Sequence, residues 1–472
     1  MTDTNSLPPF LMDVFSTPQN KLLFISCENS PEELIMEFAK YALSQKVFMV
    51  CQTTIQEPWH DGSQKLVLCY FIQNNKIVSF SIDSDEKLLL HKKGIEHLYK
   101  NKTITVNDDA TDFATVEKDY FAQKNIFQFN QPLIFDPVYI AKPWGQEIWF
   151  TGVEKRGVCQ ISPLNNPQNI SLPIPWFFAA LPSTYLGEKY KEKNLVLIKI
   201  LDPLAQEVKG DLYYELHQEK NEVYVVTQIS SEKGRIKIGI HPDKLKSFQG
   251  REEILKTEFQ QSIEQYEIIR RKIDDLKPGD TIDQNLQKEE AVLRKKMDEY
   301  AGFLDLKVGD VIAVPILVPH ALQHGVRVVE FQTPTYERLI ISFAQKVLTQ
   351  NHWDTKKAFD VMKLQAPQKS SLKIFHKSPQ CLQEFVCHFP DFSALRVTLQ
   401  KLSNFILPAL TYYEVLFFID GHGELIMEGV SYEIKPGQCI FRPAFVESVL
   451  KSASHLVFLV CRPENFNSLE QK

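Results

Sequence analysis

Two segments of the chain, GDLYYELHQEKNE and GDVIAVPILVPHALQH, carry the side chains best suited to chemistry. The first contains Glu215, His217 and Glu222, and the second contains His320 after a Gly-Asp turn. Because residues i and i+2 of a strand point to the same face, Glu215 and His217 project together, and Glu222 opens the next strand after a short turn. Two imidazoles and two carboxylates suit zinc, manganese, iron or nickel. The four residues therefore predict one metal site with a coordination position left open for water or substrate.

Other interpretations of these residues stay open at this point. A buried histidine taken alone is more often a hydrogen-bonded core residue, and a lone glutamate in a strand is often a surface residue. His324, four residues after His320, could face the same ion if the chain were helical there, or it could be a supporting or loop residue. Trp144 and Trp149, in a run rich in Gly and Pro, could pack in the core or wall a cavity.

The elements that must position the candidate ligands are mostly strands. β-Branched and aromatic residues dominate from 195 to 240, and strand patterns return at 309–318 and 326–332. Two amphipathic helices, separated by a Pro-Gly-Asp break, fill an insertion at 243–302. A further helical stretch is predicted at about 335–364.

An internal repeat extends this pattern to the C-terminal region. KVGDVIAVPILVPH at 307–320 and KPGQCIFRPAFVES at 435–448 align without a gap, which indicates two related β-barrels. The second copy has no histidine, and His422 falls in a hairpin turn. The second barrel is therefore expected to bind no metal.

The first 130 residues have a different pattern and predict a small α/β module of unknown role. Its helix is expected at 30–44, where a serine N-cap is followed by proline and glutamates. Its strands are expected at 21–27, 47–52, 65–73 and 76–82. The remaining chain divides into a metal-binding domain at 131–368 and a C-terminal barrel at 369–472, since 472 residues exceed one ordinary core.

Composition limits the kind of protein. A formal charge of −6 and a pI near 6.1 give no reason to expect a nucleic-acid partner, and no apolar run reaches the ~20 residues that span a membrane. Eight cysteines without a CxxC pair lie mostly in apolar runs, as is typical of buried thiols in a reducing compartment. The N-terminus lacks the basic and apolar regions of a signal peptide. We therefore expect a cytoplasmic protein with no membrane partner; the oligomeric state stays open.

The two ligand segments resemble the two motifs of the cupin superfamily. His217 and Glu222 match the first motif, with Glu215 at the position of its first histidine. The second motif is matched by Gly309, Pro315 and His320, whereas Leu317 stands in place of its glycine and His324 in place of its asparagine.

Within the cupins, residues 135–465 look like the type I mannose-6-phosphate isomerases. The resemblance implies two cupin (jelly-roll) β-barrels with a helical insertion, in a mainly β fold with α, preceded here by the α/β module. It also implies zinc, with manganese, iron, cobalt or nickel as alternatives, held by Glu215 in place of the family's glutamine and by the other three ligands. Three residues match positions that act on the substrate in that family: Lys220, Glu330 and Arg338.

The activity that this resemblance implies is aldose–ketose isomerisation of a sugar phosphate, most simply mannose 6-phosphate and fructose 6-phosphate, through a cis-enediol. Two alternatives remain. One is another metal-dependent cupin enzyme, such as a dioxygenase or an epimerase. The other is a non-catalytic, sugar-binding regulatory cupin.

Overall fold

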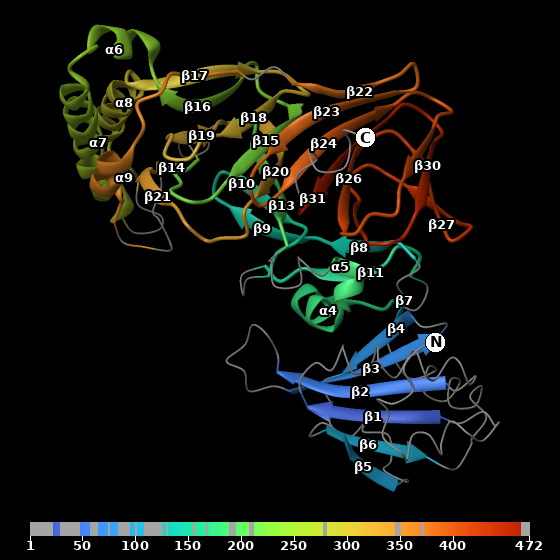
Figure 1. Ribbon diagram of the computed structural model, residues 1–472. Coiled ribbons are helices and arrows are strands. Elements are labelled where there is room, and N and C mark those ends of the chain that lie inside the picture. The colour runs from blue at the N-terminus through green and yellow to red at the C-terminus, as the bar shows by residue number, and fades with distance from the viewer. Residues whose placement is uncertain are drawn as a thin grey trace. The chain divides into compact units, whose positions relative to one another are not determined.

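The structure is a computed structural model that describes strands between residues 22 and 128 and most of the chain beyond them. The described ranges after the N-terminal strands are 131–153, 157–166, 169–187, 195–206, 212–276, 281–344, 350, 352–369 and 372–463. Within them the chain forms two compact units (Figure 1). The first unit comprises Met1–Asp136, Val153–Lys193 and Gln400–Leu456, and the second comprises Pro137–Gly152, Asn194–Leu399 and Val457–Lys472.

The N-terminal strands of the first unit form one seven-stranded sheet in the order β5-β6-β1-β2-β3-β4-β7. The strands are β1 (Leu22–Glu28), β2 (Phe48–Gln56), β3 (Lys65–Gln73), β4 (Lys76–Asp83), β5 (Ile95–Tyr99), β6 (Lys102–Asn107) and β7 (Ile126–Gln128). β1 and β2 are parallel, and the β3–β4 hairpin closes where Gln73 pairs with Lys76. All four predicted strands are confirmed within a few residues. The helix predicted at 30–44 lies outside the described residues.

The rest of the first unit contributes strands to two further sheets. One runs in the order β12-β11-β8-β29-β26 and the other in the order β25-β30-β27-β28. Their bounds are β8 (Leu133–Asp136), β11 (Gln160–Pro163), β12 (Leu172–Pro173), β25 (Asn404–Leu407), β26 (Glu414–Asp420), β27 (Gly423–Met427), β28 (Val430–Ile434), β29 (Cys439–Arg442) and β30 (Ser448–Ser452). Two short helices, α4 (Ile174–Ala180) and α5 (Ser183–Leu186), complete the unit.

The second unit contains the barrel that carries the candidate ligands. A six-stranded sheet, β18-β15-β20-β13-β10-β9, faces a five-stranded sheet, β17-β16-β19-β14-β21. The strands are β9 (Val138–Lys142), β10 (Gly145–Trp149), β13 (Leu197–Pro203), β14 (Tyr214–Leu216), β15 (Glu222–Ile229), β16 (Gly234–Ile240), β17 (Ala301–Leu306), β18 (Val311–Val314), β19 (His320–Leu322), β20 (Val326–Gln332) and β21 (Leu339–Ser342). Side chains of both sheets meet in one apolar core, among them Val226 and Val328 from the first sheet and Leu216 and Ile238 from the second. The predicted mainly β fold is confirmed.

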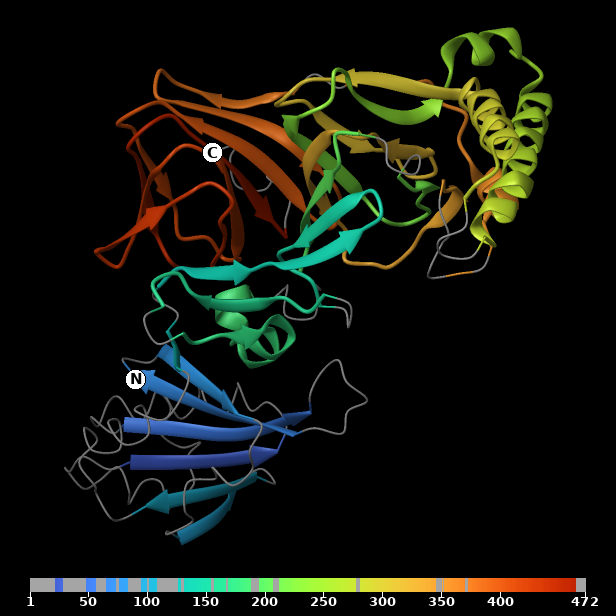
Figure 2. The ribbon, with the colours of Figure 1, turned by 180° about the vertical axis from the view of Figure 1, so that it is seen from behind.

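Helices gather at one end of this unit, next to β16, β17 and β21 (Figures 1 and 2). They are α6 (Pro242–Ser247), α7 (Glu252–Asp274), α8 (Gln284–Asp298) and α9 (Thr355–Val361). Phe259 and Tyr266 of α7 are buried in the barrel core, and Asp283 caps α8 by accepting hydrogen bonds from two backbone N–H groups. The predicted helical insertion is confirmed. No helix in the described part of the chain combines the length and the apolar character needed to cross a membrane.

The prediction of a helical stretch at about 335–364 is wrong for its first part and confirmed for α9. Its first part forms β21, which pairs with β14, and only α9 is helical among the described residues that follow. The run Leu339–Ser342 is buried and has two β-branched isoleucines at its centre, so backbone pairing with β14 outweighs the apolar spacing that resembled a helix.

Three strands complete the second unit, namely β22 (Ile374–Lys377), β23 (Cys381–His388) and β24 (Ser393–Leu399), which pair in sequence as an antiparallel meander. β31 (Leu456–Arg462) spans the boundary between the two units.

The internal repeat appears in the backbone of both barrels. Gly309 and Gly437 both have positive φ, at 88° and 85°, and so do Leu317 and Phe445, at 67° and 61°. Each pair is separated by the same 128 positions (437 − 309 and 445 − 317). Glycine adopts such angles freely, whereas a leucine there is strained, which accounts for the glycine that the cupin motif has at position 317.

Strand register extends the repeat to the first candidate segment. Glu222 pairs with Val314 across β15 and β18, and Glu414 pairs with Arg442 across β26 and β29. Val314 and Arg442 are again 128 positions apart, so Glu414 is the counterpart of Glu222. The two barrels therefore repeat the same strand pair. The glutamate is retained in both, and its cross-strand neighbour is Val314 in one barrel and Arg442 in the other.

Candidate metal centre

The four predicted ligands come from three neighbouring stretches of the second unit. Glu215 lies on β14, His217 directly follows that strand, Glu222 is the first residue of β15, and His320 is the first of β19. Glu215 and His320 form a cross-strand pair. The fold thus brings residues about a hundred positions apart onto one end of the barrel, as their spacing predicts.

Their ligand atoms converge. Atoms of Glu215, His217 and His320 all lie within 4.8 Å of one another. The Glu222 carboxylate is adjacent, with Oε2 at 3.2 Å from His217 Nε2 and Oε1 at 3.5 Å from His320 Nε2. Glu215 Oε1 lies 3.9 Å from His217 Nε2. The group of Glu215, His217 and His320 is compact enough to hold one ion, and Glu222 lies beside both of its histidines.

The two imidazoles are oriented as metal ligands. His217 Nδ1 lies 2.9 Å from the carbonyl oxygen of Glu337, and His320 Nδ1 lies 3.2 Å from that of Val318. Each Nδ1 therefore carries the proton, which leaves the Nε2 lone pair facing the cluster. Both Nε2 atoms are buried, and neither makes a hydrogen bond within the described part of the chain. This arrangement fits a metal ion.

Charges at the cluster favour the ligating forms of two of these groups. Burial alone would raise the pKa of the Glu222 carboxyl, but the Lys220 ammonium and the two imidazoles outweigh it and hold that pKa well below its ordinary value. Burial and the Lys220 charge lower the pKa of His217. At neutral pH, Glu222 is thus an anion and His217 a neutral imidazole, as metal binding requires.

His320 differs from His217 in its balance of charges. Burial acts to lower its pKa, but the Glu222 and Glu215 carboxylates outweigh burial and raise it. A metal ion at its Nε2 would compete with a proton for this nitrogen.

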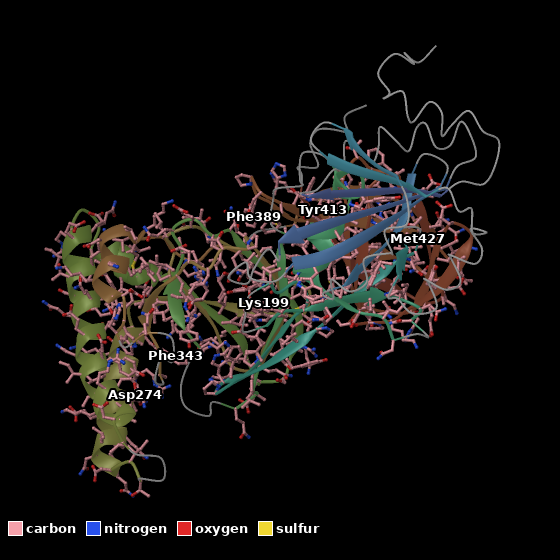
Figure 3. The ribbon with its side chains drawn as sticks, turned by 90° about the horizontal axis from the view of Figure 1, so that it is seen from below. Lys199, Asp274, Phe343, Phe389, Tyr413 and Met427 are labelled. Atoms are coloured by element: carbon pink, nitrogen blue, oxygen red, sulfur yellow. The ribbon has the colours of Figure 1, made fainter. Side chains whose placement is uncertain are left out.

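Arg338 lies beside the least enclosed ligand. Its Nη1 is 3.4 Å from Glu215 Oε2, and its guanidinium stands 4.3 Å from the centre of the Tyr213 ring. Tyr213 in turn stacks on Phe343 at 4.0 Å (Phe343 is labelled in Figure 3). Burial acts to raise the pKa of Glu215, but Arg338 and the neighbouring cations outweigh it and lower that pKa. Arg338 is therefore a neighbour of the cluster, as the sequence predicts, and forms an ion pair with Glu215.

Lys220 is part of the cluster and not a surface turn residue. Its Nζ lies 2.8 Å from Glu222 Oε2 and donates to Gln332 Oε1 at 3.3 Å. The side chain is only 8% exposed. A buried ammonium at this point can hold the Glu222 carboxylate and still offer a proton donor to a bound molecule.

Glu330 lies deeper in the same barrel. It pairs across the sheet with Tyr224 on β15 and with Lys199 on β13, and Lys199 Nζ is 3.1 Å from its Oε2 (Lys199 is labelled in Figure 3). Burial and the charge of Glu222 raise the pKa of Glu330 to about 8. A carboxyl group with this pKa can exchange a proton near neutral pH.

The other candidates lie away from the cluster. His324 lies in the turn before β20, and its Nδ1 is 3.3 Å from the carbonyl oxygen of Leu204. Trp144 is a core residue of the barrel, and Trp149 donates from Nε1 to Glu147 Oε2 at 2.8 Å. The Gly-Asp turn at 210–211 lies outside the described residues.

Three site residues were not found from the sequence. Tyr224 donates a hydrogen bond to Glu222, Lys199 pairs with Glu330, and Glu337 accepts from the backbone N–H of Gln218 at 2.8 Å. Tyr224 follows Glu222 by two positions and shares its face of the strand, and Lys199 is a single cation in an apolar strand. These two sequence patterns could have pointed to Tyr224 and Lys199 as site residues, whereas no pattern in the neighbouring sequence points to Glu337.

Several solved structures of phosphomannose isomerases have a similar fold. A mutant phosphomannose isomerase from Salmonella typhimurium superimposes with a TM-score of 0.53 at 13% identity, over 71% of this chain and 100% of that one. The apo form of mannose 6-phosphate isomerase from the same organism gives 0.52 at 12%, over 71% and 99%. A mannose 6-phosphate isomerase bound with zinc and yttrium gives 0.51 at 12%, over 70% and 99%.

Sequence comparison alone finds no such likeness. No family model matches this chain, and no curated protein matches it. At 12–13% identity the structural similarity shows the fold. We conclude that the chain has the cupin fold seen in phosphomannose isomerases.

Proposed function

We propose that this protein is a metal-dependent aldose–ketose isomerase that interconverts mannose 6-phosphate and fructose 6-phosphate. One observation carries the proposal: two buried imidazole Nε2 atoms face two carboxylates at one end of a cupin barrel. The similarity to structures of phosphomannose isomerases supports the choice of reaction. The substrate would be a free sugar phosphate in the cytoplasm, consistent with the free thiols Cys381, Cys387 and Cys439.

The metal would be held by His217, His320, Glu222 and Glu215. A set with two nitrogen and two oxygen donors suits zinc, and manganese, iron, cobalt or nickel are alternatives. When bound, the ion would supply positive charge near the substrate oxygens as negative charge develops on them. Residues 131–368 would form the catalytic domain and 369–472 a degenerate barrel, with the role of 1–130 still open.

Proton transfer would fall to the residues around the cluster. Isomerisation moves the C2 proton of the open-chain aldose to C1, while a proton is gained at O1 and lost from O2, so a group must first accept a proton and then return it. A carboxyl with a pKa raised to about 8, as at Glu330, can do both at neutral pH. Lys220 Nζ would donate to a substrate oxygen, and Arg338 would balance charge beside Glu215.

A non-catalytic sugar-binding cupin is the second candidate. It is favoured by the ion pair between Glu215 and Arg338, because a ligand already paired with a guanidinium binds a metal less strongly. The same metal cluster would then serve to bind a sugar without turning it over.

An assay of the purified full-length chain separates these functions. We expect conversion of mannose 6-phosphate to fructose 6-phosphate, followed by a coupled assay, once zinc, manganese or cobalt is supplied. Bound metal without turnover under any of these conditions would leave the binding function as the better account.

The ligand set is tested separately by metal content. His320→Ala should lower zinc affinity by a factor of at least 100 or so, because it removes a ligand outright. The matched control is His324→Ala, four residues later, whose ring contacts the Leu204 carbonyl and should leave the affinity unchanged. Equal affinities in the wild-type protein and the His320→Ala variant, measured by competition with a coloured chelator, would refute the site.

A further inference from the structure

Glu222 receives a hydrogen bond that the ligand set does not explain. Tyr224, two residues further along β15, points to the same face and donates from its hydroxyl to Glu222 Oε1. Its side chain is buried, with 4% exposure. The centre of its ring lies 6.4 Å from that of His320. Tyr224 is therefore next to two of the candidate ligands without being one of them.

Both oxygens of the Glu222 carboxylate have defined partners. Oε2 is approached by Lys220 Nζ at 2.8 Å and by His217 Nε2 at 3.2 Å. Oε1 accepts from Tyr224 and lies 3.5 Å from His320 Nε2. The Lys220 ammonium beside Oε2 and the Tyr224 hydroxyl on Oε1 hold the carboxyl group from two sides, because rotation would break the buried hydrogen bond to Tyr224 and move Oε2 away from the ammonium.

The second barrel shows the same carboxylate with a different partner. Glu414 is the counterpart of Glu222, and there Arg442 donates to it from Nε at 2.8 Å and also from Nη2. The position two residues further, equivalent to Tyr224 because both pair with an isoleucine of the neighbouring strand, is Leu416. Where the guanidinium holds the carboxylate, the tyrosine is therefore absent.

We propose that Tyr224 is a positioning residue that fixes the orientation of the Glu222 carboxylate for metal binding. The inference rests on the metal site of the proposed function and goes beyond it by assigning a role to a residue that is not a ligand. Hydrogen-bond partners of ligating groups fix their geometry, and losing one usually weakens metal binding.

The test compares two tyrosines of the same barrel. Tyr224→Phe removes the hydroxyl and keeps the ring, and Tyr214→Phe is the matched control. The Tyr214 hydroxyl is also buried, yet it has no hydrogen-bond partner within the described part of the chain. Zinc affinity, measured by chelator competition on the full-length chain, should fall about 10- to 100-fold in Tyr224→Phe and stay at the wild-type value in Tyr214→Phe.

Two further measurements separate the possible failures. Thermal unfolding of the metal-free variants checks that both variants fold. The visible spectrum of bound cobalt should change only in Tyr224→Phe, because only that variant removes the hydroxyl that donates to Glu222. Unchanged affinity and spectrum in Tyr224→Phe would overturn the proposal. A wild-type chain that binds no zinc would overturn it together with the metal site. Loss of affinity in a chain that never isomerises mannose 6-phosphate would uphold the role of Tyr224 and refute only the reaction.

Discussion

At the scale of residues, each candidate carboxylate ligand already has a cation of its own. Arg338 lies beside Glu215 and Lys220 beside Glu222. Because the buried carboxylates are largely neutralised, they tolerate burial without an ion, and a metal would add positive charge to a balanced site. Glu215 is the weaker partner for a metal, since it is 17% exposed and its second oxygen faces Arg338. Glu222, at 2% exposure, is the more enclosed of the two candidate carboxylates.

The raised pKa of Glu330 gives the first prediction at this scale. In the metal-free protein Glu330 keeps its proton to about pH 8, whereas in the unfolded chain it ionises near its ordinary value of 4.5. Its contribution to stability is therefore fully present below pH 4.5 and is lost as the pH rises to about 8. Glu330→Gln, which cannot ionise, should become progressively more stable relative to the wild-type protein across that window.

Urea unfolding at several pH values, with a chelator present, measures this difference. A stability difference that does not vary between pH 4.5 and 8 would show that Glu330 is ionised in the folded chain. Such a result would also remove the case for Glu330 as the group that accepts and returns the substrate proton.

At the scale of elements, the repeated strand pair shows how one barrel keeps a buried glutamate without the other three ligands. Glu414 and Arg442 are 0% and 1% exposed, and they face each other where Glu222 faces Val314. Arg442 also donates to the carbonyl oxygen of Val446. The guanidinium thus supplies, from within the chain, the positive charge that a metal ion would supply in the first barrel.

This arrangement predicts that the stability of the protein depends on Glu414 and Arg442 as a pair. Arg442→Met should destabilise the protein by about 3–5 kcal/mol, because it removes the buried cation that faces the Glu414 carboxylate. The double variant Glu414→Leu/Arg442→Met should recover most of that loss, since a buried ion pair replaced by apolar side chains is often neutral. Denaturant unfolding of the two variants decides the matter: similar losses in both would mean that packing, and not charge, dominates at this position.

At the scale of the whole molecule, the candidate ligands lie in one compact unit only. The cluster belongs to the second unit, whereas the Glu414–Arg442 pair belongs to the first. A ligand stabilises the part of a protein that binds it, so a metal ion should protect the second unit more than the first.

Two buried thiols can report on the units separately. Cys387 lies in the second unit and Cys439 in the first, and burial raises the pKa of both, so neither should react in the native state near pH 8. Zinc at about 100 times its Kd should slow the labelling of Cys387 about 100-fold and that of Cys439 much less. Peptide mass spectrometry after timed labelling separates the two sites, with His320→Ala as the control that zinc should not affect. Equal protection of both thiols would show that the units open together.

Much of the site could be predicted because its signals are local. The spacing of Glu215, His217 and Glu222 follows the two-residue period of a strand and then a short turn. The structure has the strand β14 at this place and a short turn before β15. The second segment placed His320 just after a strand, whereas in the structure it is the first residue of β19. Lys220, in contrast, was as compatible with a surface turn as with the buried position that it takes.

The failures have a common physical cause. The run at 335–364 was misread because the pairing of β21 with β14 joins residues more than a hundred positions apart, and pairing of that kind outweighs local spacing. Lys199 and Glu337 were missed for the same reason, because their partners lie on other strands or loops, whereas Tyr224 lies two positions from Glu222 on the same strand.

The sequence by itself determined the ligand types, the strand faces that carry them and the duplication of the barrel, because each depends on residues only a few positions apart. The tertiary structure alone decided which polar groups meet inside the barrel. Pairing of β13 with β20 brings Lys199 to Glu330, and pairing of β26 with β29 brings Arg442 to Glu414. Buried charges must be balanced by whatever lies across the barrel, and only the register of distant strands determines what that is.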